Sequence, residues 1–142
     1  MQLETVRLGT VEIDEASIIH FPKGIPGFEE LKRFAVIQPD EEAAFSFLQS
    51  VDDAGICFII TNPFWFYKDY AFDLPDSVRE ELRLEKVEEV SIWTIMSVQG
   101  EVDTATINLQ APVVINVEEK LGMQVILHQS PYHTKHKLIA SS

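Results

Sequence analysis

Apolar and polar residues alternate in short stretches along most of the chain, and this pattern predicts β-strands. The alternation is clearest at residues 11–14 and 104–111. Because successive side chains of a strand point to opposite faces, such a stretch is typical of a strand with one buried face. Further strands are predicted from runs rich in aromatic and β-branched residues, which are residues 2–8, 34–37, 44–50, 56–60, 90–98, 113–117 and 123–127.

One helix is predicted between the strands. Ser77, with Glu80 three residues later, matches a capping box, although Asp76 is an alternative N-cap. We predict a short helix over residues 78–84. Val78 and Leu82 lie one turn apart in this helix and are expected on its buried side.

Many short strands with a single helix favour an all-β fold. Strands that recur about every 8–12 residues are typical of a mainly antiparallel, barrel-like domain with one or two short helices. Closure of such a barrel hides strand edges. At this length the chain is most simply one domain, residues 1–142. Residues 129–142 are weakly patterned and are expected to form a C-terminal tail.

The densest turn pattern is FPKGIPGF at residues 21–28. Proline fixes φ, and glycine adopts backbone conformations that a β-carbon disfavours. The stretch is therefore predicted to be a rigid, bent connector in which Gly24, Pro26 and Gly27 have a structural role.

The chain is strongly acidic, with 23 Asp and Glu residues against 11 Lys and Arg residues and a net charge of −12. This charge repels phosphate groups and argues against direct binding of nucleic acid or of an anionic membrane. The acidic excess lies in the first two thirds of the chain. Residues 1–90 hold 19 acidic and 8 basic residues, whereas residues 91–142 hold 4 acidic and 3 basic residues. The acidic surface is either a solvated face or a docking face for a basic protein.

The sequence also bears on the compartment of the protein. Its start lacks a basic region followed by an apolar run, and no apolar segment approaches the roughly 20 residues that span a bilayer. The single cysteine, Cys57, cannot form an internal disulfide and is expected to be a small buried residue. These features predict a soluble, cytoplasmic protein.

Motifs for catalysis are absent from the sequence. It contains no glycine-rich phosphate loop, no nucleophile elbow and no recurring Cys or His metal pattern. His128, His133 and His136 lie close together in sequence, but their spacing matches no recurring zinc site. We therefore expect no enzymatic activity, no cofactor and no metal.

Four consecutive aromatic residues mark the best candidate for a binding site. The candidate partner-binding residues are Phe64, Trp65, Phe66, Tyr67, Asp69, Tyr70 and Asp73. No single face of a helix or strand buries four adjacent side chains, so some of them point away from the core. Aromatic residues dominate interface hot spots, and acids at the rim steer a basic partner. The alternative is structural, with Phe64 and Phe66 in the core and Trp65 and Tyr67 covering it.

Four blocks of sequence together resemble the flagellar assembly factor FliW family. The blocks are FPKGIPGF at residues 21–28, FLQS at residues 47–50, Asn62-Pro63 with Asp69-Tyr70, and TINLQAPVVIN at residues 106–116. The similarity runs in order over nearly the whole chain, to YHTKHK at residues 132–137. The chain departs from the family at Ala71, where an acidic residue often follows the Asp-Tyr pair, so the charge for a contact there is missing.

The resemblance implies a cytoplasmic, barrel-like protein without enzymatic activity that binds flagellin and, alternatively, the RNA-binding translational regulator CsrA. In this partner switch, the free protein sequesters CsrA and relieves repression of flagellin translation. Accumulating flagellin then captures the protein and restores repression. We expect the acidic first two thirds of the chain to engage the regulator, with residues 64–73 contributing. Flagellin is expected to need an apolar groove.

A second hypothesis is a small-ligand-binding β-barrel whose aromatic residues line a cavity. The two hypotheses differ in what stays bound through purification. A protein partner supports the first, and a small molecule supports the second.

Overall fold

The computed structural model describes residues 1–38, 45–97, 105–128 and 130–137. These residues form short strands, three single-turn 3-10 helices and one α-helix. In chain order the elements are β1 (Gln2–Thr5), β2 (Gly9–Glu12), η1 (Glu15–Ser17), β3 (Ile19–His20), β4 (Arg33–Ile37), β5 (Ser46–Ser50), β6 (Cys57–Thr61), η2 (Pro63–Trp65), α1 (Asp76–Glu81), η3 (Val87–Glu89), β7 (Val90–Ser97), β8 (Thr106–Ile107), β9 (Val113–Asn116), β10 (Leu121–Gln124) and β11 (His136–Lys137).

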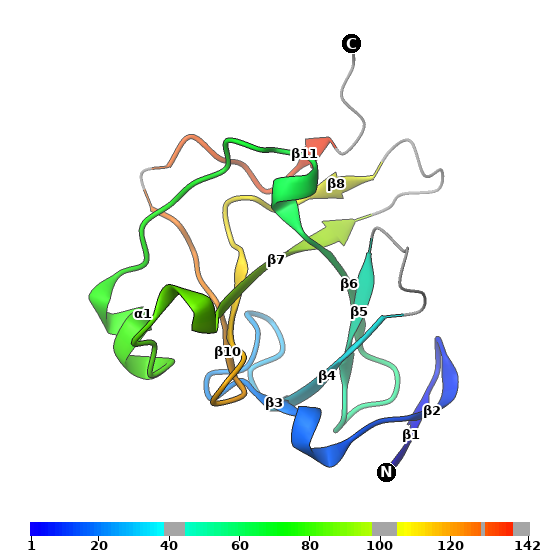
Figure 1. The fold of residues 1–142 in the computed structure, drawn as a ribbon. Helices are drawn as coiled ribbons and strands as arrows, with labels where there is room; N and C mark the ends of the chain where they lie inside the picture. The colour runs from blue at the N-terminus through cyan, green and yellow to red at the C-terminus, as the bar shows by residue number, and fades with distance from the viewer. Residues whose placement is uncertain (39–44, 98–104, 129, 138–142) are drawn as a thin grey trace.

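Seven of the strands close into a barrel (Figure 1). Hydrogen-bonded neighbours follow the order β3-β4-β5-β6-β7-β9-β10, and β10 pairs with β3 to complete the ring. The described pairings are antiparallel except that between β3 and β10. The fold confirms the predicted all-β, mainly antiparallel, barrel-like class with short helices.

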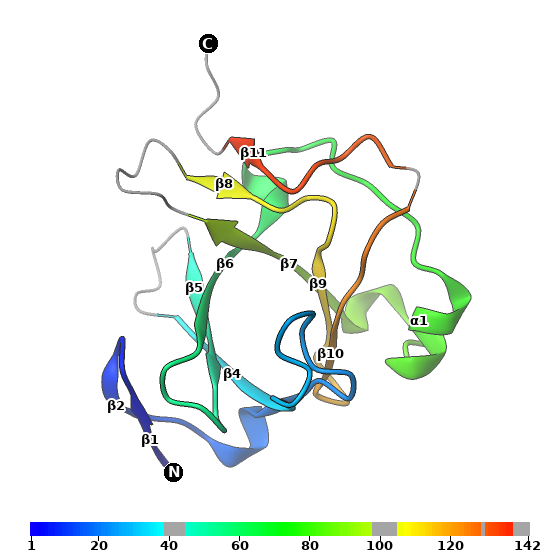
Figure 2. The ribbon, with the colours of Figure 1, turned by 180° about the vertical axis from the view of Figure 1, so that it is seen from behind.

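Two strand pairs lie outside this ring. Strand β8 pairs with the end of β7, and β11 pairs with β8. The hairpin of β1 and β2, which the alternating pattern predicts, forms a separate sheet across the barrel from α1 (Figures 1 and 2). None of the helices in the described parts of the chain is long and apolar enough to cross a membrane.

Packed side chains fill the barrel. The largest core cluster consists of Ile19, Phe21, Ile25, Leu31, Phe34, Leu48, Ile60, Val113 and Ile115. Its aromatic members are fully buried and meet edge to face, with the Phe21 and Phe34 ring centroids 5.1 Å apart. Burial of this kind supplies most of the driving force for a fold of this size.

The predicted rigid connector folds into this core. Its carbonyls at Phe21, Ile25 and Phe28 accept hydrogen bonds from the amides three residues later, at 2.8, 2.6 and 3.1 Å. The connector is therefore a series of tight turns that carries Ile25 into the barrel. Gly24 has φ 66° and Gly27 has φ 90°, a region that favours glycine. Pro26 followed by Gly27 at this φ matches a type II turn.

The predicted capping box of the helix is wrong. Helix α1 begins at Asp76, with Pro75 at the N-cap and no side-chain cap. The Pro75 carbonyl accepts hydrogen bonds from the amides of Val78 and Arg79, at 3.0 and 3.2 Å. Ser77 therefore already lies in the first turn, where it cannot act as N-cap. The predicted buried side is confirmed, because Val78 and Leu82 share one core cluster.

The strand predicted over residues 104–111 is too long. Only Thr106–Ile107 pairs in the described part, because the Asn108 side chain accepts hydrogen bonds from the amides of Gln110 and Ala111, at 3.1 and 3.0 Å. This turn takes the backbone out of the ladder. The alternation still marks burial correctly, since residues 105, 107, 109 and 111 are all buried.

The last predicted strand, residues 123–127, begins too late. Strand β10 starts at Leu121, directly after Lys120, whose φ of 57° ends the preceding turn. The predicted weak tail contains a further short strand, β11, that the pattern does not indicate. Turns predicted at residues 39–42 and 99–101 lie outside the described residues. Cys57 is half-buried, less than expected, and burial raises the pKa of its thiol.

Candidate docking surface

The aromatic segment leaves the barrel directly after β6. Asn62 caps the single turn η2 by accepting a hydrogen bond from the Phe64 amide at 2.9 Å. This turn separates the four aromatic side chains, so that Phe64 and Trp65 are 39% and 58% exposed while Phe66 and Tyr67 are half-buried. Phe64 is thus part of the surface and outside the core, contrary to the structural alternative.

Tyr70 supports this surface from below. Its side chain is only 4% exposed, and its hydroxyl donates a hydrogen bond to the Leu109 carbonyl at 2.7 Å. Burial, with a smaller contribution from Tyr132, raises the pKa of Tyr70. The Tyr70 ring packs against Phe64, with centroids 5.8 Å apart, and against Tyr132, at 4.7 Å. Tyr70 therefore orients the aromatic residues and is almost completely covered by its neighbours.

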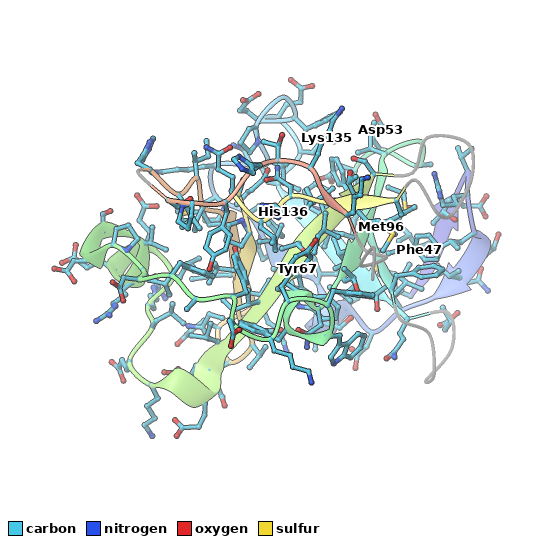
Figure 3. The ribbon with its side chains drawn as sticks, turned by 90° about the horizontal axis from the view of Figure 1, so that it is seen from above. Phe47, Asp53, Tyr67, Met96, Lys135 and His136 are labelled. Atoms are coloured by element: carbon cyan, nitrogen blue, oxygen red, sulfur yellow. The ribbon has the colours of Figure 1, made fainter. Side chains whose placement is uncertain are left out.

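The C-terminal residues 130–137, which we call the strap, hold the aromatic segment in place. The Tyr67 hydroxyl donates a hydrogen bond to the Lys137 carbonyl, and the Tyr132 hydroxyl accepts one from the Ala71 amide at 3.0 Å. Figure 3 shows Tyr67 and His136 close together, and their ring centroids are 5.4 Å apart. Sequence reasoning missed this contact. The aromatic residues within the weakly patterned tail were the only indication of it.

An apolar hollow of about 460 Å³ lies between the aromatic segment, α1 and β7. Its walls are mainly apolar and come from Phe64, Phe72, Leu74, Leu84, Val90 and Ile92, with Tyr70 and Ala71. Four charged side chains, Asp73, Arg79, Glu85 and Lys86, complete the lining. Of the predicted site residues, the structure brings Phe64, Tyr70 and Asp73 to this hollow. Trp65, Phe66, Tyr67 and Asp69 are not among its lining residues.

A second hollow adjoins the first across α1. It is lined by Arg79, Glu80, Arg83, Leu84, Glu85, Glu89 and Glu119, and so contains four carboxylates and two guanidinium groups. Arg79, Leu84 and Glu85 line both hollows. We call the first the apolar hollow and the second the acidic hollow. Sequence reasoning located the acidic excess but missed both hollows, because their walls meet only in the folded chain.

Two polar side chains, the buried Asn116 and the half-buried Glu89, fix the walls of both hollows. The Asn116 amide nitrogen donates hydrogen bonds to the Leu82 and Arg83 carbonyls, at 2.6 and 3.3 Å, and thereby holds the end of α1 on strand β9. The Glu89 carboxylate accepts hydrogen bonds from the amides of Glu85 and Lys86, at 3.0 and 2.7 Å. The loop between α1 and β7 is therefore ordered by its own side chains.

The described residues show no side-chain cluster for metal binding. No group of three His, Cys, Asp or Glu side chains there could hold a metal ion. The His136 ring accepts a hydrogen bond from the His133 amide at 2.8 Å and stacks on the His133 ring. Asp52 forms an ion pair with Arg33, whose hydrogen bond lowers the pKa of that carboxyl group. Both features stabilise local structure.

Fold and site together define a small, closed, mainly antiparallel β-barrel protein with exposed aromatic residues beside an apolar hollow. A family model described as FliW protein matches residues 2–138. The chain belongs to the FliW family.

The relatives match nearly the full length of the chain. Flagellar assembly factor FliW of Alkaliphilus metalliredigens (strain QYMF) is 41% identical over 140 residues, which cover 98% of this chain and 86% of the relative. Flagellar assembly factor FliW of Clostridium novyi (strain NT) is 43% identical over 97% of this chain and 96% of its own length. A crystal structure of the flagellar assembly factor FliW superposes with a TM-score of 0.91 at 39% identity, covering 99% of this chain and 98% of that chain.

Proposed function

We propose that this chain is a non-enzymatic, cytoplasmic flagellar assembly factor that binds flagellin and a CsrA-type translational regulator in alternation. The free protein sequesters the regulator, which relieves repression of flagellin translation. Accumulating flagellin captures the protein, and the released regulator represses translation again. Family membership supports the assembly role. The two named partners are our proposal.

The observation that carries the proposal is the exposed aromatic segment on a strongly acidic chain. Exposed aromatic side chains, here Phe64 and Trp65, are the residues that most often dominate interface energies. A net charge of −12 disfavours binding of messenger RNA itself but attracts a basic RNA-binding protein and accelerates the encounter. Such a partner would also lose access to RNA in the negative field.

The small-ligand hypothesis receives no support from the barrel interior. The aromatic residues that it needs around a cavity pack against one another in the core, as Phe21 and Phe34 do. The apolar hollow lies outside the ring of strands, between α1 and the aromatic segment.

The experiment replaces Trp65 with alanine and measures the affinities for purified regulator and for flagellin by calorimetry. We expect Trp65→Ala to weaken binding of at least one partner by about tenfold or more, because it removes an aromatic side chain that the partner would cover in the complex. Unfolding by urea should be nearly unchanged, since Trp65 is 58% exposed.

The control is Phe45→Ala, which removes another exposed aromatic side chain, 37% exposed, ahead of β5. Its affinities should equal those of the unmodified protein. If folded Trp65→Ala bound both partners as tightly as the unmodified protein, the aromatic segment would not be the interface.

A further inference from the structure

We propose that the apolar and acidic hollows form one docking surface for a basic segment of the regulator. An apolar side chain of the segment enters the apolar hollow, and its basic side chains lie over the acidic hollow. This inference rests on the proposed function, and it adds α1, the loop after it and Glu119 to residues 64–73, which the sequence prediction assigned to the regulator.

The apolar hollow has the properties of an anchor site. Its walls, which include Phe72, Leu84 and Ile92, are apolar, and the space between them is open to a partner side chain. A large apolar side chain that leaves water for such a hollow contributes favourably to the free energy of binding. Ala71 at the wall is small and exposed, so it leaves this space unfilled.

Charge complementarity selects a basic segment. The charged side chains of the apolar hollow are balanced, with Asp73 and Glu85 against Arg79 and Lys86. The acidic hollow is not balanced, because its four carboxylates exceed its two guanidinium groups. Its one ion pair in the described chain, between Arg83 and Glu119, is long at 4.0 Å and exposed. A segment that crosses from one hollow to the other therefore meets an excess of negative charge.

The surface is preorganised, which lowers the cost of binding. Asn116 fixes the end of α1, and the Glu89 carboxylate fixes the loop that follows. An ion pair between Lys23 and Glu81, at 2.6 Å, also links α1 to the connector. A partner therefore does not have to order these elements on binding.

The first test fills the apolar hollow. Ala71→Trp places a large side chain in the hollow, and the hydrogen bond to the Tyr132 hydroxyl is kept because residue 71 donates it from its backbone amide. We expect the affinity for purified CsrA-type regulator, measured by calorimetry, to fall by about tenfold or more. The control is Ala54→Trp, an equal change at an exposed residue in the turn between β5 and β6, which should bind as the unmodified protein does.

The second test reverses one charge. Glu85→Lys changes a side chain that lines both hollows and should weaken regulator binding, most strongly at low salt. Glu15→Lys makes the same net change in η1, away from α1 in both ribbon views, and should have a much smaller effect (Figures 1 and 2).

The outcomes separate this inference from the proposed function. If the unmodified protein binds no regulator, the proposed function fails. If it binds the regulator and Ala71→Trp binds equally well, only the docking surface is wrong. The docking assignment is also overturned if Ala71→Trp loses flagellin and keeps the regulator, because the hollow then serves the other partner.

Discussion

Single residues decide how the connector enters the barrel, and Gly24 and Gly27 do so for different reasons. Both have positive φ, which costs a residue with a β-carbon roughly 1–2 kcal/mol. At Gly24 the backbone also approaches closely, since a β-carbon there would lie 2.6 Å from the Glu29 α-carbon. At Gly27 the space around the β-carbon position is open to 4 Å.

We predict that Gly27→Ala lowers the free energy of unfolding by about 1–2 kcal/mol and that Gly24→Ala lowers it further. The additional loss at Gly24 measures the clash with the backbone of Glu29. Urea unfolding monitored by fluorescence provides the comparison. Gly55→Ala is the control, because a β-carbon there makes only an ordinary contact, at 3.5 Å. Equal losses for Gly24→Ala and Gly27→Ala would contradict the close approach.

Residue patterns in the sequence predicted which side chains are buried better than they predicted which backbone groups form hydrogen bonds. The alternation through residues 105–111 identified the buried side chains correctly, because it reflects which face meets the core. It overestimated the strand, because Asn108 bonds to nearby amides and ends the ladder. The choice of Pro75 over Ser77 as N-cap likewise depends on local geometry that a capping motif does not contain.

At the scale of elements, the strap is the least predictable part of the described chain. Strand β11 has only two residue pairs with β8, and its position depends on contacts of Tyr67 and Tyr132 with residues far away in sequence. No period of apolar residues encodes such contacts. The strap also contains a titratable side chain, His136, whose ring stabilises the strap by accepting a hydrogen bond from the His133 amide.

Protonation of His136 is expected to loosen the strap. Burial lowers the pKa of His136, and the neighbouring His133 lowers it further; Tyr67 and Tyr132 are the other titratable side chains that its ring contacts. The released strap therefore binds more protons as the pH falls below about 6.5, the ordinary value for histidine. The strap has its full stability above this pH and loses stability as the pH falls toward the folded pKa. Protonation also removes the acceptor for the His133 amide.

Hydrogen exchange of the Ala71 amide, which donates to the Tyr132 hydroxyl of the strap, reports on the strap. We predict weaker protection at pH 5.5 than at pH 7.5 after correction for intrinsic exchange rates. In His136→Gln, which does not titrate, the protection should no longer depend on pH. The same pH dependence in both proteins would contradict a role for His136.

At the scale of the whole molecule, the sequence predicted the barrel because its strand spacing and turns are local properties. The candidate site was only partly predictable. The aromatic segment is continuous in sequence and was found, whereas the hollows combine this segment with α1, β7 and Glu119. The closing pair of β3 and β10 shows the same limit, because it joins residues about one hundred positions apart and leaves no local pattern.

Competition on a size-exclusion column tests the partner switch directly. The complex of this protein with purified CsrA-type regulator is isolated, and flagellin is added in increasing amounts. We predict that the regulator elutes alone in proportion to the flagellin added, while this protein moves into the flagellin complex. A complex that retains both partners, or a protein that binds neither, would contradict the partner switch.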